Sequence, residues 1–247
     1  MLITGGSGRL GRELTALMAH ASAPPRADLD VTDAEAVLAT FRRAAPAVVV
    51  HAAAFTDVAG AERDRAGAWR VNVLGTRNVA TACAAIDAVL VHVSTDYVFW
   101  GDADDARRRR GGYVESDATG PVRNYYASTK LAAEDEARLT PRHLIVRTSF
   151  RAREWPHPVA FTDLHTTQTY VDEIAPEIAA VAEAAARIVA EGVHVLHVAG
   201  APTTAFELAR RRSPDVRAAT KGDASVDLPD DVGLDSSLWH ALRERLR

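Results

Sequence analysis

The sequence has almost no cysteine and no long apolar run. Cys83 is the only cysteine among 247 residues, so no disulfide can form within the chain. This suits a reducing compartment, and we expect a cytoplasmic protein. No apolar run approaches the roughly 20 residues that a membrane span needs, and the first residues lack the charged and apolar regions of a signal peptide. We therefore expect no contact with a membrane.

Lysine is also scarce, although basic residues are not. Only Lys130 and Lys221 among the 29 basic residues are lysines, and the remainder are arginines. The formal net charge of −4 argues against a general nucleic-acid binder. A hydrophobic share of 47% and a charged share of 25% are ordinary for a globular protein, and the length suits one large domain.

Apolar runs and helical patterns alternate along the chain. Runs that predict buried strands occupy residues 2–4, 47–53, 88–95, 143–149 and 193–200. Helical patterns occupy residues 9–20, 61–86, 126–139, 172–191, a stretch from about 203, and 236–246. This alternation predicts an α/β fold, in which helices cover a Rossmann-like, doubly wound parallel sheet.

One expected strand is missing from this pattern. Residues 21–30 read "ASAPPRADLD", where a second strand would follow the first helix. Pro24 and Pro25 disfavour an interior strand, because proline lacks the N–H group that the sheet ladder needs. We expect an irregular or edge segment there.

The first strand leads directly into the turn "GGSGRLG". Gly5, Gly8 and Gly11 have the spacing G-x-x-G-x-x-G, and Gly6, Gly8 and Gly11 have the spacing G-x-G-x-x-G. Glycines at these positions allow a tight turn and let the backbone approach a pyrophosphate at the N-terminus of the next helix. A turn without a ligand would also use glycine, but the strand–turn–helix context favours dinucleotide binding.

Residues 124–130 read "NYYASTK", which places Lys130 four positions after Tyr126. Side chains at i and i+4 lie on one helix face. An ammonium close to a phenol stabilises the phenolate and lowers the tyrosine pKa toward the range useful for general acid catalysis. Tyr125 points elsewhere by about 100° of helix rotation and is expected to pack. A solvated helix face is the alternative, which the scarcity of lysine disfavours.

Ser94 and Thr95 end the strand predicted at residues 88–95. Open α/β sheets bind ligands at the C-terminal ends of their strands. We therefore expect these hydroxyls and the Tyr126 helix to meet in one crevice, although hydroxyls at such positions also cap helices and turns.

The chain resembles the extended short-chain dehydrogenases/reductases, and most closely their dTDP-4-dehydrorhamnose reductase branch. The glycine turn and the Tyr-x-x-x-Lys pair are shared across that superfamily, whereas "STDYVF" and "TDVxxAE" are fairly specific to the branch. The matching segments run in order along nearly the whole chain and are "ITGGSGRLG", "LDVTD", "VVVHAAAFTDVAGAE", "VNVLGTRNVA", "STDYVF", "YASTKLAAE", "IVRTS", "TYVDEIA" and "LDSS".

The resemblance implies a role for each matching residue. Thr95, Tyr126 and Lys130 would be catalytic: Thr95 would hold the substrate oxygen, Tyr126 would donate a proton, and Lys130 would support Tyr126 and contact the nicotinamide ribose. The substrate would also contact Asp96 and Phe150, and no metal would take part. The cofactor would lie against Tyr126 and Lys130 and against Gly5, Gly8, Arg9, Leu10, Gly11, Arg26, Asp30, Val31, Ala53, Ala54 and Thr56.

The activity implied by the resemblance is NAD(P)H-dependent reduction of a 4-keto-6-deoxy nucleotide-sugar. Arg26 precedes Asp30 near the end of the missing strand, where an arginine can accommodate the 2′-phosphate of NADP. We therefore expect NADPH to be preferred over NADH, unless Arg26 is one more surface arginine. Reduction of another small keto compound, epimerisation, and a non-catalytic NADP-binding regulatory subunit remain alternatives. Relatives often pair through helices, which suggests a homodimer.

The resemblance weakens after Phe150. The chain continues as "RAREWPHPVAF" instead of an aromatic residue and a "YG"-like turn, and "TTQ" at 166–168 stands where the family has a "GSP"-like segment. We therefore predict an NAD(P)-binding Rossmann domain over residues 1–150. Residues 151–247 would form a shortened substrate-binding region, interleaved with the last elements of the sheet.

An arginine run and a set of histidines could each suggest a binding site. The arginine run 107–110 is expected to be a solvated loop, with a phosphate clamp as the alternative. The histidines on predicted strands lack the arrangement of metal ligands and are expected to pack, and they are His51, His92, His194 and His197.

Overall fold

A five-stranded parallel sheet forms the centre of the molecule. The computed structural model describes residues 1–101 and 111–246, so the arginine run 107–110 lies outside the described residues. The parallel sheet confirms the predicted α/β class. Its strands are, in spatial order, β1 (Leu2–Thr4), β2 (Val48–His51), β3 (Val89–Thr95), β4 (His143–Thr148) and β9 (Val195–His197).

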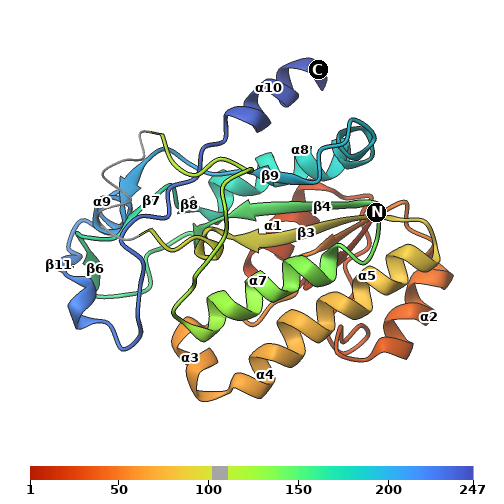
Figure 1. Cartoon of the computed structure of the whole chain (residues 1–247), viewed down its shortest axis with the longest axis horizontal. Helices are drawn as coiled ribbons and strands as arrows, with labels where there is room; N and C mark the ends of the chain where they lie inside the picture. Colours follow the sequence, from red (N-terminus) through yellow and green to blue (C-terminus); the bar gives the residue numbers. More distant parts are fainter. Residues whose placement is uncertain (102–110, 247) are drawn as a thin grey trace.

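Helices cover both faces of this sheet, and each face encloses its own apolar core (Figure 1). One face is covered by α1 (Arg9–Leu17) and α8 (Val171–Ala190). The other is covered by α2 (Ala34–Ala44), α5 (Gly75–Ala85) and α7 (Tyr125–Ala137). In the described part of the chain, none of the helices combines the length and apolar character that a bilayer span requires.

The helix predicted over residues 61–86 is interrupted. The structure has α3 (Val58–Arg63), α4 (Arg65–Trp69) and a π-helical turn η1 (Arg70–Leu74) before α5 begins. Asp64 causes the first break, because its carboxylate accepts a hydrogen bond from the Gly67 N–H at 2.8 Å and so caps α4. The prediction of one helix was wrong here.

Helix α2 was not predicted, although its ends carry ordinary signals. The Asp33 side chain accepts a hydrogen bond from the Ala36 N–H at 3.0 Å, and arginines in the last turn favour the helix dipole. Val37 and Phe41, four residues apart, are completely buried against the sheet. These two apolar anchors are too few to stand out from the alanines and polar residues around them.

The second strand is reduced to a single bridge. Ser22 forms an isolated parallel bridge with Leu2, in which the Ile3 N–H donates to the Ser22 carbonyl at 2.8 Å. No strand follows before Pro24 and Pro25. This agrees with the irregular segment expected there.

Most elements after β4 form a small region at one end of the sheet (left in Figure 1). Its core is built on Trp155, Leu164, Tyr170 and Leu208. Helix α8 and strand β9 leave this region to join the main sheet. Its paired strands are β5 (Phe150–Arg151) with β8 (Thr169–Tyr170), β6 (Val159–Phe161) with β11 (Arg217–Ala219), and β7 (His165–Thr166) with β10 (Thr203–Thr204), and its helices are α9 (Ala205–Arg210) and η3 (Lys221–Asp223). Helix α10 (Ser237–Leu246) lies apart from this region, at the top in Figure 1, and buries Trp239 and Leu242 in the core of the main sheet.

A buried ion pair fastens helix α7 to the sheet. Arg147 of β4 donates from Nε to Oε1 of Glu134 at 3.0 Å and from Nη2 to Oε2 at 2.9 Å. The Ser94 hydroxyl of β3 donates to the same Oε1 at 2.7 Å. Both charged side chains are almost fully covered, with 4% and 1% of their surface exposed. Helix α7 is therefore tied to two neighbouring strands at once.

We expect the substitution Arg147→Met to lower the free energy of unfolding by about 3–5 kcal/mol, because it leaves Glu134 buried without its counter-charge. Arg142→Met is the matched control, since Arg142 pairs with Asp87 in a largely exposed bridge that should contribute less than about 1 kcal/mol. Urea unfolding of both variants measures the difference. Equal losses would contradict this role of the buried pair.

Candidate functional site

A cavity of about 360 Å³ extends from the glycine-rich turn to strand β5. It lies where the ends of β1, β2, β3 and β4 meet, as expected for an open parallel sheet. Gly11 is the one predicted site residue outside its lining. The predicted residues that line it are Gly5, Gly8, Arg9, Leu10, Arg26, Asp30, Val31, Ala53, Ala54, Thr56, Thr95, Asp96, Tyr126, Lys130 and Phe150.

The glycine-rich turn is built by close backbone contact. Gly5 has φ +70°, and a Cβ there would lie 2.7 Å from the Ala53 backbone. A Cβ on Gly11 would lie 2.2 Å from the Gly5 carbonyl oxygen, so Gly11 lets α1 approach the turn. Gly8 starts α1 without a side-chain cap, and the first turn carries no acidic residue. The N–H groups at this helix start therefore suit an anion.

A charged pair lies on the coil that replaces the second strand. Arg26 donates to Asp30 Oδ2 from Nε and Nη2, both at 3.2 Å, and its side chain is 73% exposed. The other Asp30 oxygen accepts hydrogen bonds from Thr32. The backbone hydrogen bond from Thr32, followed by its hydroxyl and Arg26, lowers the pKa of Asp30. Arg26 thus lies at the cavity mouth, within reach of a ligand.

The three predicted catalytic residues meet at the other end of the cavity. Tyr126 and Lys130 stand on α7, whose start is capped by Asn124. Thr95 ends β3, and its hydroxyl donates to Asp96 Oδ1 at 2.9 Å. Lys130 is 3% exposed, and its Nζ donates to the Val93 carbonyl at 2.9 Å. The sheet end and the helix therefore bring a hydroxyl, a phenol and an ammonium to one place.

Burial sets the protonation of this cluster. Burial raises the pKa of Tyr126 above its ordinary value and the charge of Asp96 adds to this, while hydrogen bonding with Thr95 lowers it. Burial lowers the pKa of Lys130 to about 8, and burial raises the pKa of Asp96 to about 6. The expected lowering of the Tyr126 pKa is therefore wrong for this structure, because burial outweighs it, and Tyr126 is protonated and can serve as a proton donor.

Asn72 was missed by the sequence analysis. It lies in the π-helical turn, where its Nδ2 donates to the Thr129 hydroxyl at 2.9 Å and its Oδ1 accepts from the Phe55 N–H at 2.7 Å. These bonds join the cavity-lining segment around Phe55 to helix α7. An amide between the apolar residues of "VNVLG" is the signal that could have identified it, since a buried amide needs hydrogen-bond partners.

The polar residues behind Phe150 were also missed. Gln168 donates from Nε2 to the Ser149 hydroxyl at 2.8 Å, and Arg151 donates from Nε to Gln168 Oε1 at 2.7 Å. Thr166 donates to Asp96 Oδ2 at 3.4 Å. Ser149, Arg151 and Gln168 all line the cavity. Arg151 and Gln168 belong to segments in which the sequence departs from the family pattern, so no motif identified them, whereas Ser149 ends the matching segment "IVRTS".

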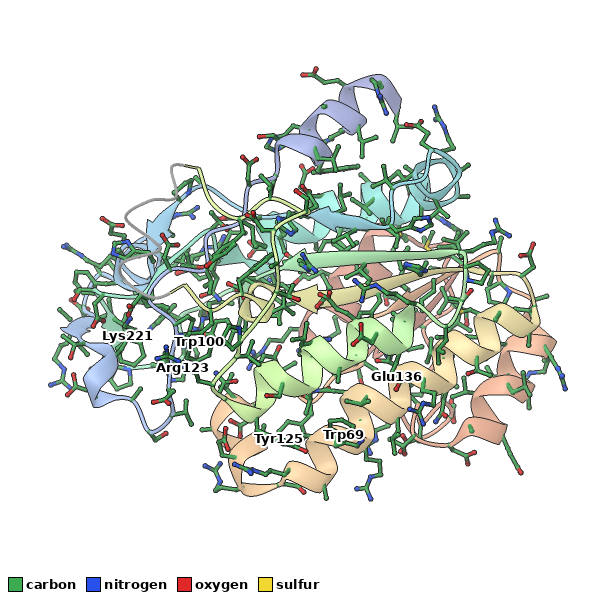
Figure 2. The ribbon with its side chains drawn as sticks, viewed as in Figure 1. Trp69, Trp100, Arg123, Tyr125, Glu136 and Lys221 are labelled. Atoms are coloured by element: carbon green, nitrogen blue, oxygen red, sulfur yellow. The ribbon has the colours of Figure 1, made fainter. Side chains whose placement is uncertain are left out.

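Tyr125 lies outside the cavity lining, unlike its neighbour Tyr126. Figure 2 shows Tyr125 at the start of α7, on the side of α3 and α4. The Arg65 guanidinium lies 5.0 Å from the centre of its ring, and the Tyr125 N–H donates to Glu62 Oε1 at 2.6 Å. Tyr125 is thus a packing residue, and Glu62 secures the start of α7.

The strand histidines pack inside the fold. His51 exchanges hydrogen bonds with the hydroxyls of Thr4 and Thr76 at 2.7 and 3.1 Å, and burial lowers its pKa to about 3. His197 is held by the Tyr113 carbonyl at 2.9 Å. Among residues 1–101 and 111–246, no three His, Cys, Asp or Glu side chains gather as a metal site would require.

A second, open cavity of about 630 Å³ lies beside the segment 221–230. Figure 2 shows Trp100, Arg123 and Lys221 at this end of the molecule. Its lining holds two cationic side chains, Arg123 and Lys221, against the three carboxylates of Glu62, Asp227 and Asp230. Because carboxylates outnumber cations in this lining, the second cavity does not favour an anionic ligand. The first cavity, which holds the glycine-rich turn and the Tyr126 cluster, is therefore the candidate active site.

The comparisons with known proteins point to one family. Residues 1–154 match the family model described as "RmlD substrate binding domain". A dTDP-4-dehydrorhamnose reductase of Streptomyces griseus is 47% identical over 139 residues, which cover 54% of this chain and 43% of that protein. Its counterpart in Mycobacterium tuberculosis H37Rv is 41% identical over 155 residues, which cover 61% and 49%. The chain spans about half the length of the curated relatives it matches.

Solved structures extend the likeness over the whole chain. The dTDP-4-dehydrorhamnose reductase of Bacillus anthracis in complex with NADP has a TM-score of 0.83 and 25% identity, with 99% of this chain and 96% of that chain covered. The UDP-glucose 4-epimerase of Thermus thermophilus in complex with NAD has a TM-score of 0.75 at 20% identity, with 98% and 92% covered, which shows a shared fold alone.

We expect Lys130→Arg to weaken dinucleotide binding and to lower the free energy of unfolding by about 1–3 kcal/mol, although the charge is kept. The pocket that covers the ammonium fits a compact group, and the broader guanidinium would strain it. Thermal unfolding and NADPH titration measure both effects, with Lys221→Arg as the matched control. A Lys130→Arg protein that behaves like the control would show that only positive charge matters at this position.

Proposed function

Because the chain belongs to the RmlD substrate binding domain family, we propose that it is an NADPH-dependent reductase of a 4-keto-6-deoxy nucleotide-sugar. The observation that carries this proposal is the single cavity in which the glycine-rich turn and the cluster of Thr95, Tyr126 and Lys130 meet. A dinucleotide on the turn would extend toward the cluster, which is where a reducible carbonyl must lie.

The residues present fit a nicotinamide dinucleotide. Any side chain on Gly5 would collide with the Ala53 backbone, so the turn leaves room for a pyrophosphate against the uncapped start of α1. Lys130 would hold the nicotinamide ribose, and Val31 with Asp30 would lie beside the adenine half. When bound, the dinucleotide supplies a hydride to the carbonyl carbon.

The protein's own chemistry is the placement and delivery of one proton. Thr95 would donate a hydrogen bond to the substrate oxygen, which fixes the carbonyl beside the Tyr126 hydroxyl. Tyr126, held protonated by its buried position, would give its proton to the oxygen as negative charge develops there. The ammonium of Lys130 would then stabilise the phenolate that remains.

The substrate class is proposed from the named relatives and from the cavity. Relatives are named dTDP-4-dehydrorhamnose reductase and, in Streptomyces niveus, dTDP-4-keto-6-deoxy-D-glucose reductase. Asp96 and Phe150 line the end of the cavity where the sugar would lie. Asp96 could accept hydrogen bonds from sugar hydroxyls, and Phe150 could pack against the deoxy carbon. We further propose a cytoplasmic homodimer.

Turnover should depend on Tyr126 and not on Tyr125. We expect Tyr126→Phe to lower kcat by about 10²–10⁴-fold while folding and NADPH binding survive, since only the donor hydroxyl is removed. Tyr125→Phe is the matched control and should keep most activity. The assay follows NADPH oxidation with a dTDP-4-keto-6-deoxy sugar. Equal losses in the two variants would refute the role of Tyr126, and an inactive wild type that binds NADPH would favour a regulatory subunit.

NADPH should bind more tightly than NADH, because Arg26 can leave its exposed pair with Asp30 and bind the 2′-phosphate. We expect Arg26→Ala to weaken NADPH binding by about tenfold and to leave NADH binding nearly unchanged. Arg63→Ala is the control, since that arginine is equally exposed and lies outside the cavity lining. Fluorescence titration measures the affinity of each protein for each cofactor. Tighter binding of NADH than of NADPH to the wild type would contradict the prediction.

A further inference from the structure

Arg151 is a charged residue of the cavity that the proposed reaction does not use. Two other cavity cations have partners, since Arg26 pairs with Asp30 and Lys130 donates to a backbone carbonyl, whereas Arg9 lines the cavity at the start of α1. Arg151 donates one hydrogen bond, from its Nε to Gln168 Oε1 at 2.7 Å. Its two terminal nitrogens make no hydrogen bond or ion pair with any residue in the described ranges 1–101 and 111–246.

The guanidinium is nevertheless held in place. It lies over the indole of Trp155, with its central carbon 5.1 Å from the ring centre. Trp155 is buried and donates from Nε1 to the Val159 carbonyl at 3.1 Å. Gln168 is fixed in turn by its bond to Ser149 at 2.8 Å. Trp155 and Gln168 thus orient the Arg151 guanidinium, and its two terminal nitrogens remain able to donate hydrogen bonds from the cavity wall.

Arg151 lies on β5 directly after Phe150, and both residues line the cavity. Burial raises the pKa of Asp96 to about 6, and the charge of Arg151 is among the factors that oppose this shift. Burial lowers the pKa of His157, and the charges of Arg151 and Arg9 lower it further. Arg151 is therefore close enough to Asp96 to act on its carboxyl group, and its charge reaches His157, as does that of Arg9.

We propose that Arg151 binds a phosphoryl group through its two terminal nitrogens, from the β5 side of the cavity. An oriented arginine fork matches two oxygens of a phosphate and gains strength where water is partly excluded. The turn before α1 already suits such a group, and Arg151 adds a second, cationic contact. The phosphoryl group comes either from the cofactor pyrophosphate or from the diphosphate of the substrate. This inference rests on the proposed function.

The test compares Arg151→Gln and Arg151→Lys with the wild type in three titrations. NADPH alone reports the cofactor as the source, dTDP added to the NADP-bound protein reports the substrate, and inorganic pyrophosphate reports phosphoryl binding without either. We expect Arg151→Gln to weaken NADPH or dTDP by about 10- to 100-fold, with a smaller loss in Arg151→Lys, which keeps the charge but not the fork.

Arg153→Gln is the matched control, because it removes the same charge two residues away, where Arg153 pairs with Glu13 outside the cavity lining. Its affinities should stay within twofold of the wild type. If Arg151→Gln also binds all three probes within twofold of the wild type, the proposal is overturned. A wild type that binds pyrophosphate but neither NADPH nor dTDP overturns the proposed function, and Arg151 is then judged by the pyrophosphate arm alone.

Discussion

The geometry of the site depends on one buried ion pair. Glu134 lies one helical turn after Lys130 and two turns after Tyr126. Its carboxylate accepts two hydrogen bonds from Arg147 of β4 and one from Ser94 of β3. Because α7 cannot slide or rotate without breaking these bonds, its two preceding turns are held over the ends of the same strands. The pair also has a specific cost, since desolvated charges stabilise a fold only when their bonding is complete.

The order of the main elements could be predicted from the sequence because its signals are local. The five apolar runs and the glycine turn define their own positions, whether or not the rest of the chain is known. The interruption at Asp64 could not be predicted in the same way. Its helical residues on both sides fit one periodic pattern, and only the bond from Gly67 to the Asp64 carboxylate divides them. Helix α2 was not predicted, because two buried side chains among small residues make a weak helical pattern.

The site residues also differ in whether a local sequence motif could identify them. Residues that line the cavity from a turn or a strand end, such as Gly5 and Thr95, belong to motifs and could be named from the sequence. Asn72 and Gln168 act through partners far along the chain, Thr129 and Ser149, and such pairs become visible only when the fold brings them together. Gly11 shows a third case, in which a motif residue supports the turn without lining the cavity.

The bridge at Ser22 covers part of one edge of the main sheet. Strand β1 is an edge strand of the main sheet, and an edge with unpaired N–H and C=O groups can recruit a strand from a second molecule. Here Ser22 occupies part of that edge, and Pro24 and Pro25 follow at once. Proline offers no N–H to an incoming strand, so this segment makes the β1 edge a poor template for edge-to-edge pairing.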